Sequence, residues 1–334
     1  MPPPVLVAPD KFKGTLRAPE VAAALGRGFE AGGWPVDLCP VADGGEGTQE
    51  VLLLALGGET AGATVSDPLG RPVRAGFALI EDGGTAIVEV AAGSGLGLLE
   101  AAERDAEAAS SYGTGELILA AARTGAQVIL VGAGGSASTD GGAGALDAIA
   151  EAGGVGAARL VVLCDVRTPW ERAAELFAPQ KGADAAGVAR LAARLEAQAA
   201  ALPRDPRGVP LGGAAGGLAG GLWAALGARL VPGAPFVLDA LRFDARMRTA
   251  RAVVVGEGSI DEQTLYGKAA GEISTRARQG GVPAYAVVGE NALDLFAQRI
   301  LDLGEIREAS TLGELEAAGQ ALAATIGPPA LGRK

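Results

Sequence analysis

The sequence predicts an α/β protein: a Rossmann-like parallel-sheet domain built from both chain ends, with a second α/β domain inserted between them. Short apolar runs near both ends are typical of buried parallel strands, and each leads into a polar, glycine-rich loop and then a segment with helical spacing. The middle of the chain has shorter strand-like runs separated by turn residues. We expect residues 1–60 and 245–334 to form the first domain and residues 61–244 the inserted one, with the active-site cleft between them.

The N-terminal part alternates strands and helices. Val5–Ala8 is an apolar run that ends at Pro9 and Asp10, as a buried strand ends in a loop. Apolar residues with helical spacing follow over Pro19–Phe29, and a second strand is expected over Val36–Val41. A glycine-rich loop then leads into a helix through Leu56. This strand, loop, helix order predicts parallel strands.

The central part has a different texture. Three runs of alternating character predict a half-exposed antiparallel sheet: 63–65, 72–79 and 85–90. A strongly apolar strand returns at 128–131, and a long Ala-rich helix is expected over about 183–202. Near the C-terminus the first pattern resumes, with strands at 251–255 and 284–289 and a helix from about Gly267.

Composition excludes several classes of function. The 334 residues carry 39 Asp and Glu against 28 Lys and Arg, a net charge of −11, so no nucleic acid is expected as a partner. The chain has no histidine, which excludes Ser-His-Asp and Cys-His hydrolase chemistry and His-ligated zinc. Any general base must therefore be Asp, Glu, Lys, Tyr or Cys. The two cysteines, Cys39 and Cys164, are expected to be small buried residues in a reducing compartment.

No targeting or membrane segment is expected. The N-terminus lacks the basic and apolar regions of a signal peptide. The longest uncharged stretch, 208–228, contains paired glycines and Pro210, so it predicts a glycine-rich loop that opens a buried helix rather than a membrane span. We expect a cytoplasmic protein without membrane contact.

Four loops that follow apolar strands combine acidic residues, glycines and hydroxyls. In an open α/β sheet, ligands bind at the carboxyl ends of the strands, where glycines let backbone N–H groups approach phosphates and carboxylates can hold Mg²⁺. Each loop alone is weak, because an Asp-Gly turn after a strand is usually structural. The four loops are residues 8–15, 43–48, 132–142 and 256–261, the last completed by Gly267 and Lys268.

The third loop has a rival interpretation. Gly132, Gly134 and Ala137 match the dinucleotide fingerprint G-x-G-x-x-A, with Glu151 about twenty residues further on. That fingerprint requires a helix to start inside the motif, whereas residues 138–142 prolong the loop here. A P-loop is absent, because Gly267-Lys268 is followed by Ala269. An NAD(P)-dependent oxidoreductase and a non-catalytic protein that binds small carboxylates stay open as alternatives.

Taken together, these strings resemble the bacterial glycerate kinase family. The resemblance runs in the family's order along nearly the whole chain, which is far more specific than one short motif. The matching segments are 8–10 with 12–14, 41–48, 67–70, 112–118, 134–137 with 140–144, 164–166, 179–183, 213–218, 256–258, Asp261, 263–265 and 267–268.

The resemblance implies transfer of the ATP γ-phosphoryl group to a hydroxyl of D-glycerate, with Mg²⁺, giving phosphoglycerate and ADP. The 2-phosphate is favoured over the 3-phosphate. It implies a Rossmann-like domain and a second α/β domain, and a homodimer is compatible with it. Since phosphoryl transfer needs positioning and charge neutralisation, acidic and lysine side chains are the candidates.

The candidate residues are drawn from the four loops, from one further loop that carries Lys181, and from Asp165, which follows the apolar run Val161–Cys164. The catalytic candidates are Asp261, Asp165, Asp140 and Lys268. The candidates for Mg²⁺ are Asp43, Asp140 and Asp165. The candidates for substrate or phosphate binding are Asp10, Lys13, Asp43, Gly134, Gly135, Ser136, Glu257 and Lys181.

Overall fold

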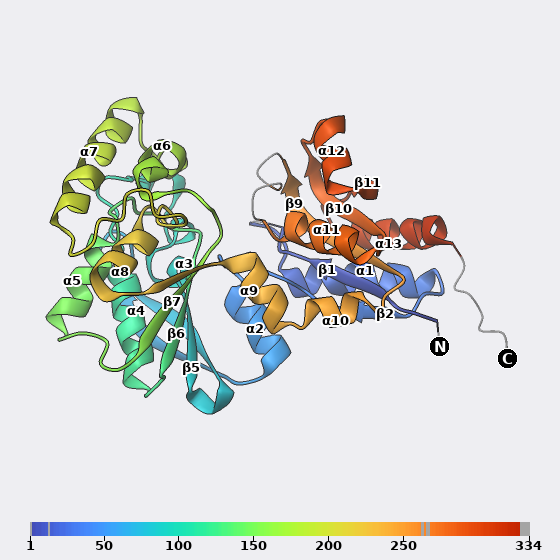
Figure 1. The fold of residues 1–334 in the computed structure, drawn as a ribbon, viewed down its shortest axis with the longest axis horizontal. Coiled ribbons are helices and arrows are strands. Elements are labelled where there is room, and N and C mark those ends of the chain that lie inside the picture. Colours follow the sequence, from blue (N-terminus) through green and yellow to red (C-terminus); the bar gives the residue numbers. More distant parts are fainter. Residues whose placement is uncertain (1, 13, 262–263, 265–267, 328–334) are drawn as a thin grey trace. The chain divides into compact units, whose positions relative to one another are not determined.

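The computed structural model describes residues 2–12, 14–261, 264 and 268–327. Its contacts divide the chain into two compact units (Figure 1). Unit 1 is Met1–Asp43 with Ala234–Lys334, and unit 2 is Gly44–Gly233. Unit 1 therefore comes from both ends of the chain. The domain limits near residues 60 and 245 inferred from the sequence stay a prediction.

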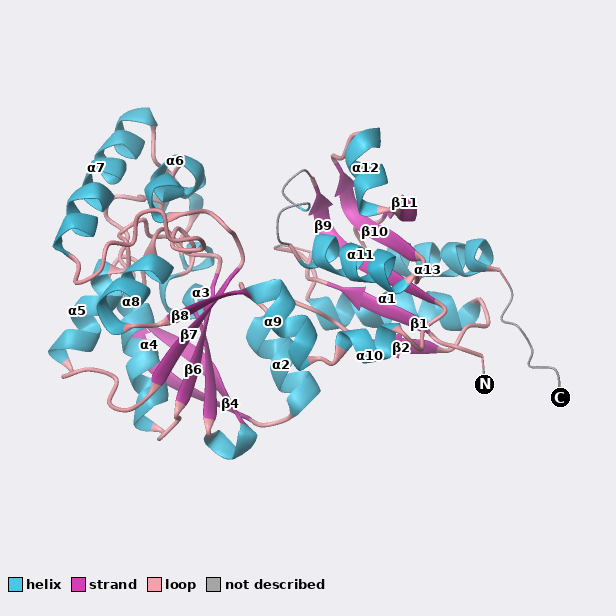
Figure 2. Ribbon diagram, viewed as in Figure 1, coloured by secondary structure: helices cyan, strands magenta, loops and turns pink. Residues whose placement is uncertain are grey.

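Unit 1 is built on a parallel five-stranded sheet in the order β11-β10-β9-β1-β2 (Figure 2). Its strands are β1 (Val5–Pro9), β2 (Val36–Leu38), β9 (Ala252–Ile260), β10 (Ala284–Asn291) and β11 (Leu303–Glu308). Its helices are α1 (Ala18–Ala31), α10 (Phe243–Met247), α11 (Ala269–Gly280), α12 (Leu295–Leu301) and α13 (Leu312–Ile326), with α9 (Gly233–Ala240) at the boundary of the unit.

Strand β1 shows why this sheet is buried on both faces. Val5 and Val7 pack in one core cluster with α1 and α13, while Leu6 points to the opposite face and is equally buried. Helices α10 and α11 lie on that opposite face. A near-continuous apolar run is the expected sequence of a strand covered on both sides. The predicted parallel sheet from both chain ends is confirmed.

Unit 2 is built on a mixed six-stranded sheet in the order β3-β4-β5-β6-β7-β8. Its strands are β3 (Glu59–Ser66), β4 (Pro72–Ile80), β5 (Thr85–Glu89), β6 (Val128–Ala133), β7 (Arg159–Cys164) and β8 (Arg229–Pro232). Its helices are α2 (Thr48–Leu56), α3 (Val90–Ser94), α4 (Tyr112–Arg123), α5 (Ala143–Glu151), α6 (Ala173–Phe177), α7 (Ala185–Ala201) and α8 (Leu218–Leu226).

The direction of the chain changes within this sheet at β5. Strands β3, β4 and β5 are antiparallel, as the sequence predicts for the middle of the chain, but β5 is parallel to β6. β6, β7 and β8 continue parallel. The carboxyl ends of β5, β6, β7 and β8 therefore share one edge, where the loops of unit 2 gather. The second sheet confirms an α/β fold with an inserted mixed sheet.

The glycine-rich stretch before α8 packs inside unit 2 as predicted. Trp170, fully buried, is the centre of a small apolar cluster with α6 and α7. In the stretch before α8, a Cβ at Gly213 would stand 2.5 Å from the carbonyl oxygen of Pro169, and one at Gly217 would stand 3.3 Å from the indole of Trp170, so glycine is required for the close approach. No helix in the described ranges combines the length and hydropathy needed to cross a bilayer.

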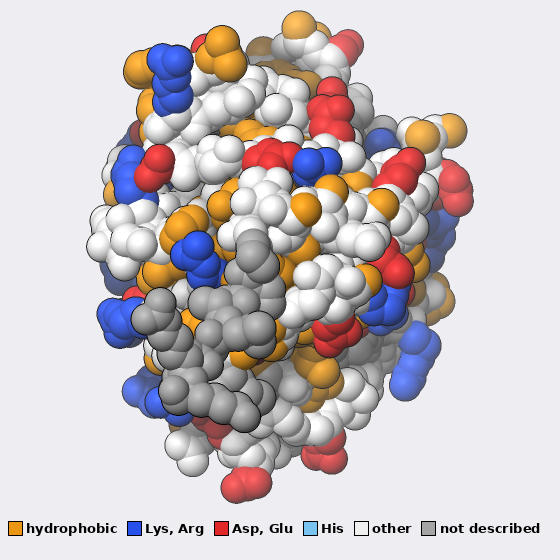
Figure 3. Space-filling model, turned by 90° about the vertical axis from the view of Figure 1, so that its right-hand side faces the viewer, with side chains coloured by type: hydrophobic (Ala, Val, Ile, Leu, Met, Phe, Trp, Pro, Cys, Tyr) orange, Lys and Arg blue, Asp and Glu red, His pale blue; other side chains and the backbone are white. Residues whose placement is uncertain are grey.

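The face drawn in Figure 3 shows how the charge of the chain is distributed there. Lys and Arg side chains stand apart from one another and alternate with Asp and Glu. Phosphate backbones are bound by clustered Lys and Arg, and the described side chains on this face form no such cluster.

Candidate active site

In unit 1, the topology brings three predicted acidic residues to one edge of the sheet. Asp10 directly follows β1, and its N–H donates to the carbonyl of Gly256 on β9 at 2.8 Å, which places it beside Glu257. The chain after β2 continues along β1, with the N–H of Val41 donating to the carbonyl of Pro9 at 2.9 Å. Asp43 follows two residues later. Parallel pairing therefore gathers Asp10, Asp43 and Glu257 at one edge of the sheet.

Glu257 and Lys268 form the central ion pair of this cluster. Nζ of Lys268 lies 2.9 Å from Oε1 of Glu257 and 3.5 Å from Oδ1 of Asp261. Burial lowers the pKa of Lys268, but the two carboxylates outweigh it and the pKa is raised. Lys268 therefore stays charged at neutral pH.

The carboxyl of Glu257 is the unusual acid of unit 1. Burial raises its pKa to about 7, with Asp43 and Asp261 acting in the same direction and Lys268 against them. Its second oxygen, Oε2, is buried and has no hydrogen-bond partner within the described residues. Burial, Asp43 and Glu257 likewise hold the pKa of Asp10 well above its usual range. A carboxyl that titrates near neutrality can exchange protons at physiological pH.

In unit 2, the glycines of two loops pack against each other at the carboxyl end of β6. A Cβ on Gly134 would stand 2.6 Å from Cα of Gly45 and 2.8 Å from Oδ2 of Asp165. Gly44 has φ +97°, and a Cβ there would stand 2.6 Å from Cα of Gly233. These positions admit only glycine, because the backbone of one loop lies against the next. Gly134, Gly45 and Asp165 are thus held together at one edge of the sheet.

Glu89, at the end of β5, belongs to the same edge and was not among the predicted residues. Its Oε1 accepts the N–H of Gln49 in the first turn of α2 at 2.8 Å. The sequence pattern placed Glu89 in a half-exposed antiparallel strand. Only the parallel pairing of β5 with β6 brings its carboxylate to the strand ends.

Asp140 is held by the protein chain itself. Its Oδ2 accepts from the N–H and the hydroxyl of Ser111, at 2.9 and 2.7 Å, and from the N–H of Gly144 at 3.2 Å. Its Oδ1 accepts from the N–H of Gly142 at 3.1 Å. These bonds tie the loop after β6 to the start of α4 and to the first turn of α5. Ser111, which the sequence analysis did not single out, is fully buried in this network.

Lys181 is buried, with 2% of its surface exposed. Its ammonium donates to Oγ of Ser136 at 2.8 Å and to the carbonyl of Ser138 at 2.5 Å. Burial lowers its pKa to about 8, and the charges of Asp140 and Asp165 oppose that shift. Lys181 therefore contacts the Gly134–Gly142 loop from the inside of unit 2.

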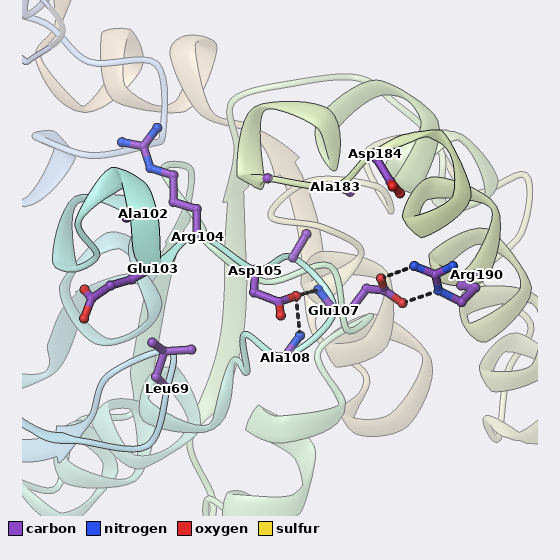
Figure 4. Close-up of a pocket in the computed structure, with 12 residues that line it drawn as sticks. Leu69, Ala102, Glu103, Arg104, Asp105, Glu107, Ala108, Ala183, Asp184 and Arg190 are labelled. Carbon is purple, nitrogen blue, oxygen red and sulfur yellow. Dashed lines mark hydrogen bonds and ion pairs between the residues drawn. The ribbon is translucent and has the colours of Figure 1, made fainter.

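A separate surface pocket of about 600 Å³ lies in unit 2 (Figure 4). Its charged groups are mostly paired within the chain: Arg190 forms two bonds with Glu107, and Asp105 accepts the N–H groups of Glu107 and Ala108. None of the predicted site residues lines it.

The structure thus gathers the candidates into two groups, one in each unit. Unit 1 holds Asp10, Asp43, Glu257, Asp261 and Lys268, and unit 2 holds Gly134, Gly135, Ser136, Asp140, Asp165 and Lys181. Lys13 lies outside the described residues. Among the residues described, no three acidic or Cys side chains converge closely enough to hold a metal ion by themselves.

Comparison with known proteins decides the family. Residues 5–154 and 153–324 match the model of the glycerate kinase family. This chain belongs to the glycerate kinase family. The glycerate kinase of Bacillus subtilis (strain 168) is 37% identical over 330 residues, covering 87% of this chain and 86% of that relative. The glycerate 2-kinase of Escherichia coli (strain K12) is 35% identical over 323 residues, covering 85% and 84%.

A solved structure agrees with these relatives. A crystal structure from Salmonella typhimurium LT2 that carries the name glycerate kinase 2 covers 98% of both chains, with a TM-score of 0.79 and 32% identity. The predicted family and enzyme class, a glycerate kinase and therefore a phosphotransferase, are confirmed. As a kinase, the family implies ATP as the phosphoryl donor.

The geometry also bears on the dinucleotide interpretation of the third loop. In that fingerprint a helix begins within the glycine motif. Here α5 begins at Ala143, after the whole loop, and Gly142 precedes it in the left-handed conformation. The loop is therefore built differently from a nicotinamide site, in agreement with the family assignment.

Proposed function

We propose that this glycerate kinase phosphorylates the 2-hydroxyl of D-glycerate with MgATP, giving 2-phosphoglycerate and ADP. The choice of the 2-hydroxyl is supported by the Escherichia coli relative, which is named glycerate 2-kinase. The observation that carries the mechanism is the Glu257–Lys268 pair of unit 1, a buried carboxyl whose pKa is raised to about 7 beside a charged ammonium.

In this mechanism Glu257 accepts the proton of the glycerate hydroxyl. An efficient general base has a pKa near the working pH, and Glu257 meets that condition with one oxygen left unpaired in the described chain. Asp261 is less suited, because its side chain is 37% exposed. Lys268 keeps its charge and stabilises the ionised form of Glu257. Asp261 then helps to hold Lys268, while Asp10, Asp43 and Lys13 contribute to substrate binding.

The loop after β6 in unit 2 serves to bind anionic oxygens. Gly135 is exposed and has φ +68°, so its backbone is open to an approaching ligand. Within the described chain, the N–H groups of Gly135 and Ser136 have no acceptor. Backbone N–H groups beside small residues are a common cradle for phosphates. We assign this loop to substrate oxygens on that basis.

Carboxylate oxygens are the ligands that Mg²⁺ prefers, and kinases hold it with one or two carboxylates together with substrate phosphates. Asp43 in unit 1 and Asp165 in unit 2 each offer such a carboxylate, and each is a candidate ligand of the ion. Asp140 fits it less well, because its oxygens already accept four bonds from the chain. We therefore propose that Asp140 positions the loop. Bound Mg²⁺ would neutralise charge on the transferred phosphoryl group.

The test is ADP release from the purified protein with MgATP and D-glycerate, with the product identified by phosphorus NMR. Turnover to 2-phosphoglycerate supports the proposal. Turnover to 3-phosphoglycerate would overturn the choice of hydroxyl, while glycerate binding without ADP release would favour a binding protein. A matched reaction without Mg²⁺, in chelator, tests the metal, since the proposal requires the rate to collapse there.

A further inference from the structure

The contact between Lys181 and Ser136 has a directional consequence. A lysine ammonium is only a donor, so at the 2.8 Å bond the hydroxyl oxygen of Ser136 is the acceptor. The single proton of that hydroxyl must point elsewhere. No acceptor for it lies within the described part of the chain.

This unused proton is nearly buried, since Ser136 retains 6% of its surface. A buried donor without an acceptor is unfavourable, and such groups in native proteins usually have a ligand or a water as partner. The neighbouring ammonium also polarises the O–H bond and makes it a stronger donor. The group is therefore suited to an oxygen that carries negative charge.

The ammonium of Lys181 is not placed to contact such an anionic oxygen directly. Its ammonium is enclosed between the Gly134–Gly142 loop and residue 216, where a Cβ would stand 2.9 Å from Nζ and 2.2 Å from the carbonyl of Ser138. Within the described residues it has no carboxylate within salt-bridge distance, and both of its hydrogen-bond acceptors, Oγ of Ser136 and the carbonyl of Ser138, are neutral oxygens. Burying a cation without a carboxylate in contact costs free energy of folding, so a functional role is the expected reason for keeping it.

We propose that Lys181 is a positioning residue that fixes the direction of the Ser136 hydroxyl proton, and that this proton binds an anionic oxygen of a substrate. The oxygen belongs to a phosphate of ATP or to the carboxylate of glycerate. The proposal rests on the assignment of this loop to substrate binding made above. It replaces direct phosphate binding by Lys181 with an indirect role through Ser136.

Steady-state kinetics on the full chain test this proposal. Ser136→Ala should raise one KM by about 10- to 100-fold, the usual weight of a hydrogen bond to a charged group, and change kcat less. A raised KM for ATP assigns the oxygen to a phosphate, and a raised KM for glycerate assigns it to the carboxylate. Lys181→Met should raise the same KM. In the double variant, the same KM should exceed that of the more affected single variant by no more than about threefold, because both substitutions remove the same interaction.

The matched control is Ser274→Ala, which removes a buried serine hydroxyl that lies outside this loop, in α11, and already donates to the carbonyl of Ala270. Both KM values should stay within about twofold of the original protein. If Lys181→Met does not fold, Ser136→Thr is measured in its place. Because threonine keeps the hydroxyl, this variant should recover most of the substrate affinity that Ser136→Ala loses.

Three outcomes overturn the proposal while the original protein still turns over. These are unchanged KM values in Ser136→Ala, as expected if only a water binds this proton, fully multiplicative effects in the double variant, and a KM effect of Lys181→Met on the other substrate. Absence of turnover in the original protein would instead overturn the proposed function.

Discussion

Nζ of Lys268 lies 2.9 Å from Oε1 of Glu257, while Oε2 of the same carboxylate is buried without a partner in the described chain. One oxygen is thus held by a cation and the other is left able to take a proton. The pairing favours the ionised carboxylate, whereas burial favours the neutral acid, and the two influences leave the pKa near 7. Small changes at either residue should therefore change the pH range of activity.

Glu257→Gln should lower kcat/KM by at least about 100-fold, roughly 2.7 kcal/mol in transition-state free energy, because the amide cannot accept the hydroxyl proton. The original enzyme should gain activity as the pH rises through about 7, where Glu257 becomes ionised. That rise should be missing from the residual activity of the variant. Glu290→Gln, an exposed glutamate on the neighbouring strand β10, is the control and should behave like the original enzyme.

The stability of Glu257→Gln separates loss of the base from loss of the fold. The pKa of Glu257 is raised in the folded state, so its contribution to stability is present at low pH and is lost as the pH rises through about 7. At pH 8 the original protein carries a buried charge that the amide avoids. Urea unfolding should show no decrease in stability at that pH. A destabilised variant would mean that the Lys268 pairing outweighs burial.

Lys268→Met should move the acid side of the pH profile upward. Without the cation, burial and the nearby carboxylates raise the pKa of Glu257 further, so ionisation needs a higher pH. Lys268→Arg keeps the charge and should preserve the position of the rise. The rate against pH between 5 and 9 measures both. An unmoved profile in Lys268→Met would show that the observed titration belongs to another group.

Asp140→Asn should act on the fold before it acts on chemistry. The carboxylate accepts bonds from Ser111, Gly142 and Gly144, and an amide nitrogen would face donors with a donor. A loss of about 2–4 kcal/mol in unfolding free energy is expected from a broken buried network. Asp147→Asn on the exposed side of α5 should leave stability within about 0.5 kcal/mol. A fully stable Asp140→Asn that lost Mg²⁺ dependence would instead make Asp140 a metal ligand.

Gly134→Ala tests the close approach of the loops in unit 2. The new methyl group would stand 2.6 Å from Cα of Gly45, so the loops must separate, at a cost of about 1–3 kcal/mol and with a higher KM. Gly313→Ala is the contrasting glycine, because nothing lies within 4 Å of its Cβ position in α13. There the change should stabilise the protein by about 0.5–1 kcal/mol. Thermal unfolding and steady-state kinetics on both variants test this prediction. Equal changes in stability and KM at the two glycines would contradict the close approach of the loops at Gly134.

The sequence was most informative where one strand and its loop carry the signal. The runs at Val5–Ala8 and 251–255 predict buried strands because both faces of the sheet are covered, and their loops hold Asp10 and Glu257. Strand direction is not encoded in alternation, so the parallel pairing of β5 with β6 could not be predicted. Glu89 was missed for that reason.

Hydrogen bonds between residues that are distant in the sequence also could not be predicted from the sequence alone. Asp140 fits the pattern of a metal ligand, yet Ser111, from a distant loop, and two nearby amides use its oxygens. A lysine next to a glycine, as at Lys181, suggests a contact to phosphate. In the structure this side chain is buried and reaches Ser136, which lies 45 residues away in the sequence. Such roles depend on tertiary packing, which residue type and local spacing do not contain.

The pairing of β1 with β9 constrains the order in which the two units can fold during synthesis on the ribosome. Val5 pairs with Ala252, so β1 leaves the exit tunnel roughly 250 residues before its neighbour, an interval of some tens of seconds at about 5–20 residues per second. During that interval the whole of Gly44–Gly233 is synthesised. The inserted segment thus has the opportunity to fold first, while the N-terminal strands wait with an unpaired edge that nascent-chain chaperones would protect.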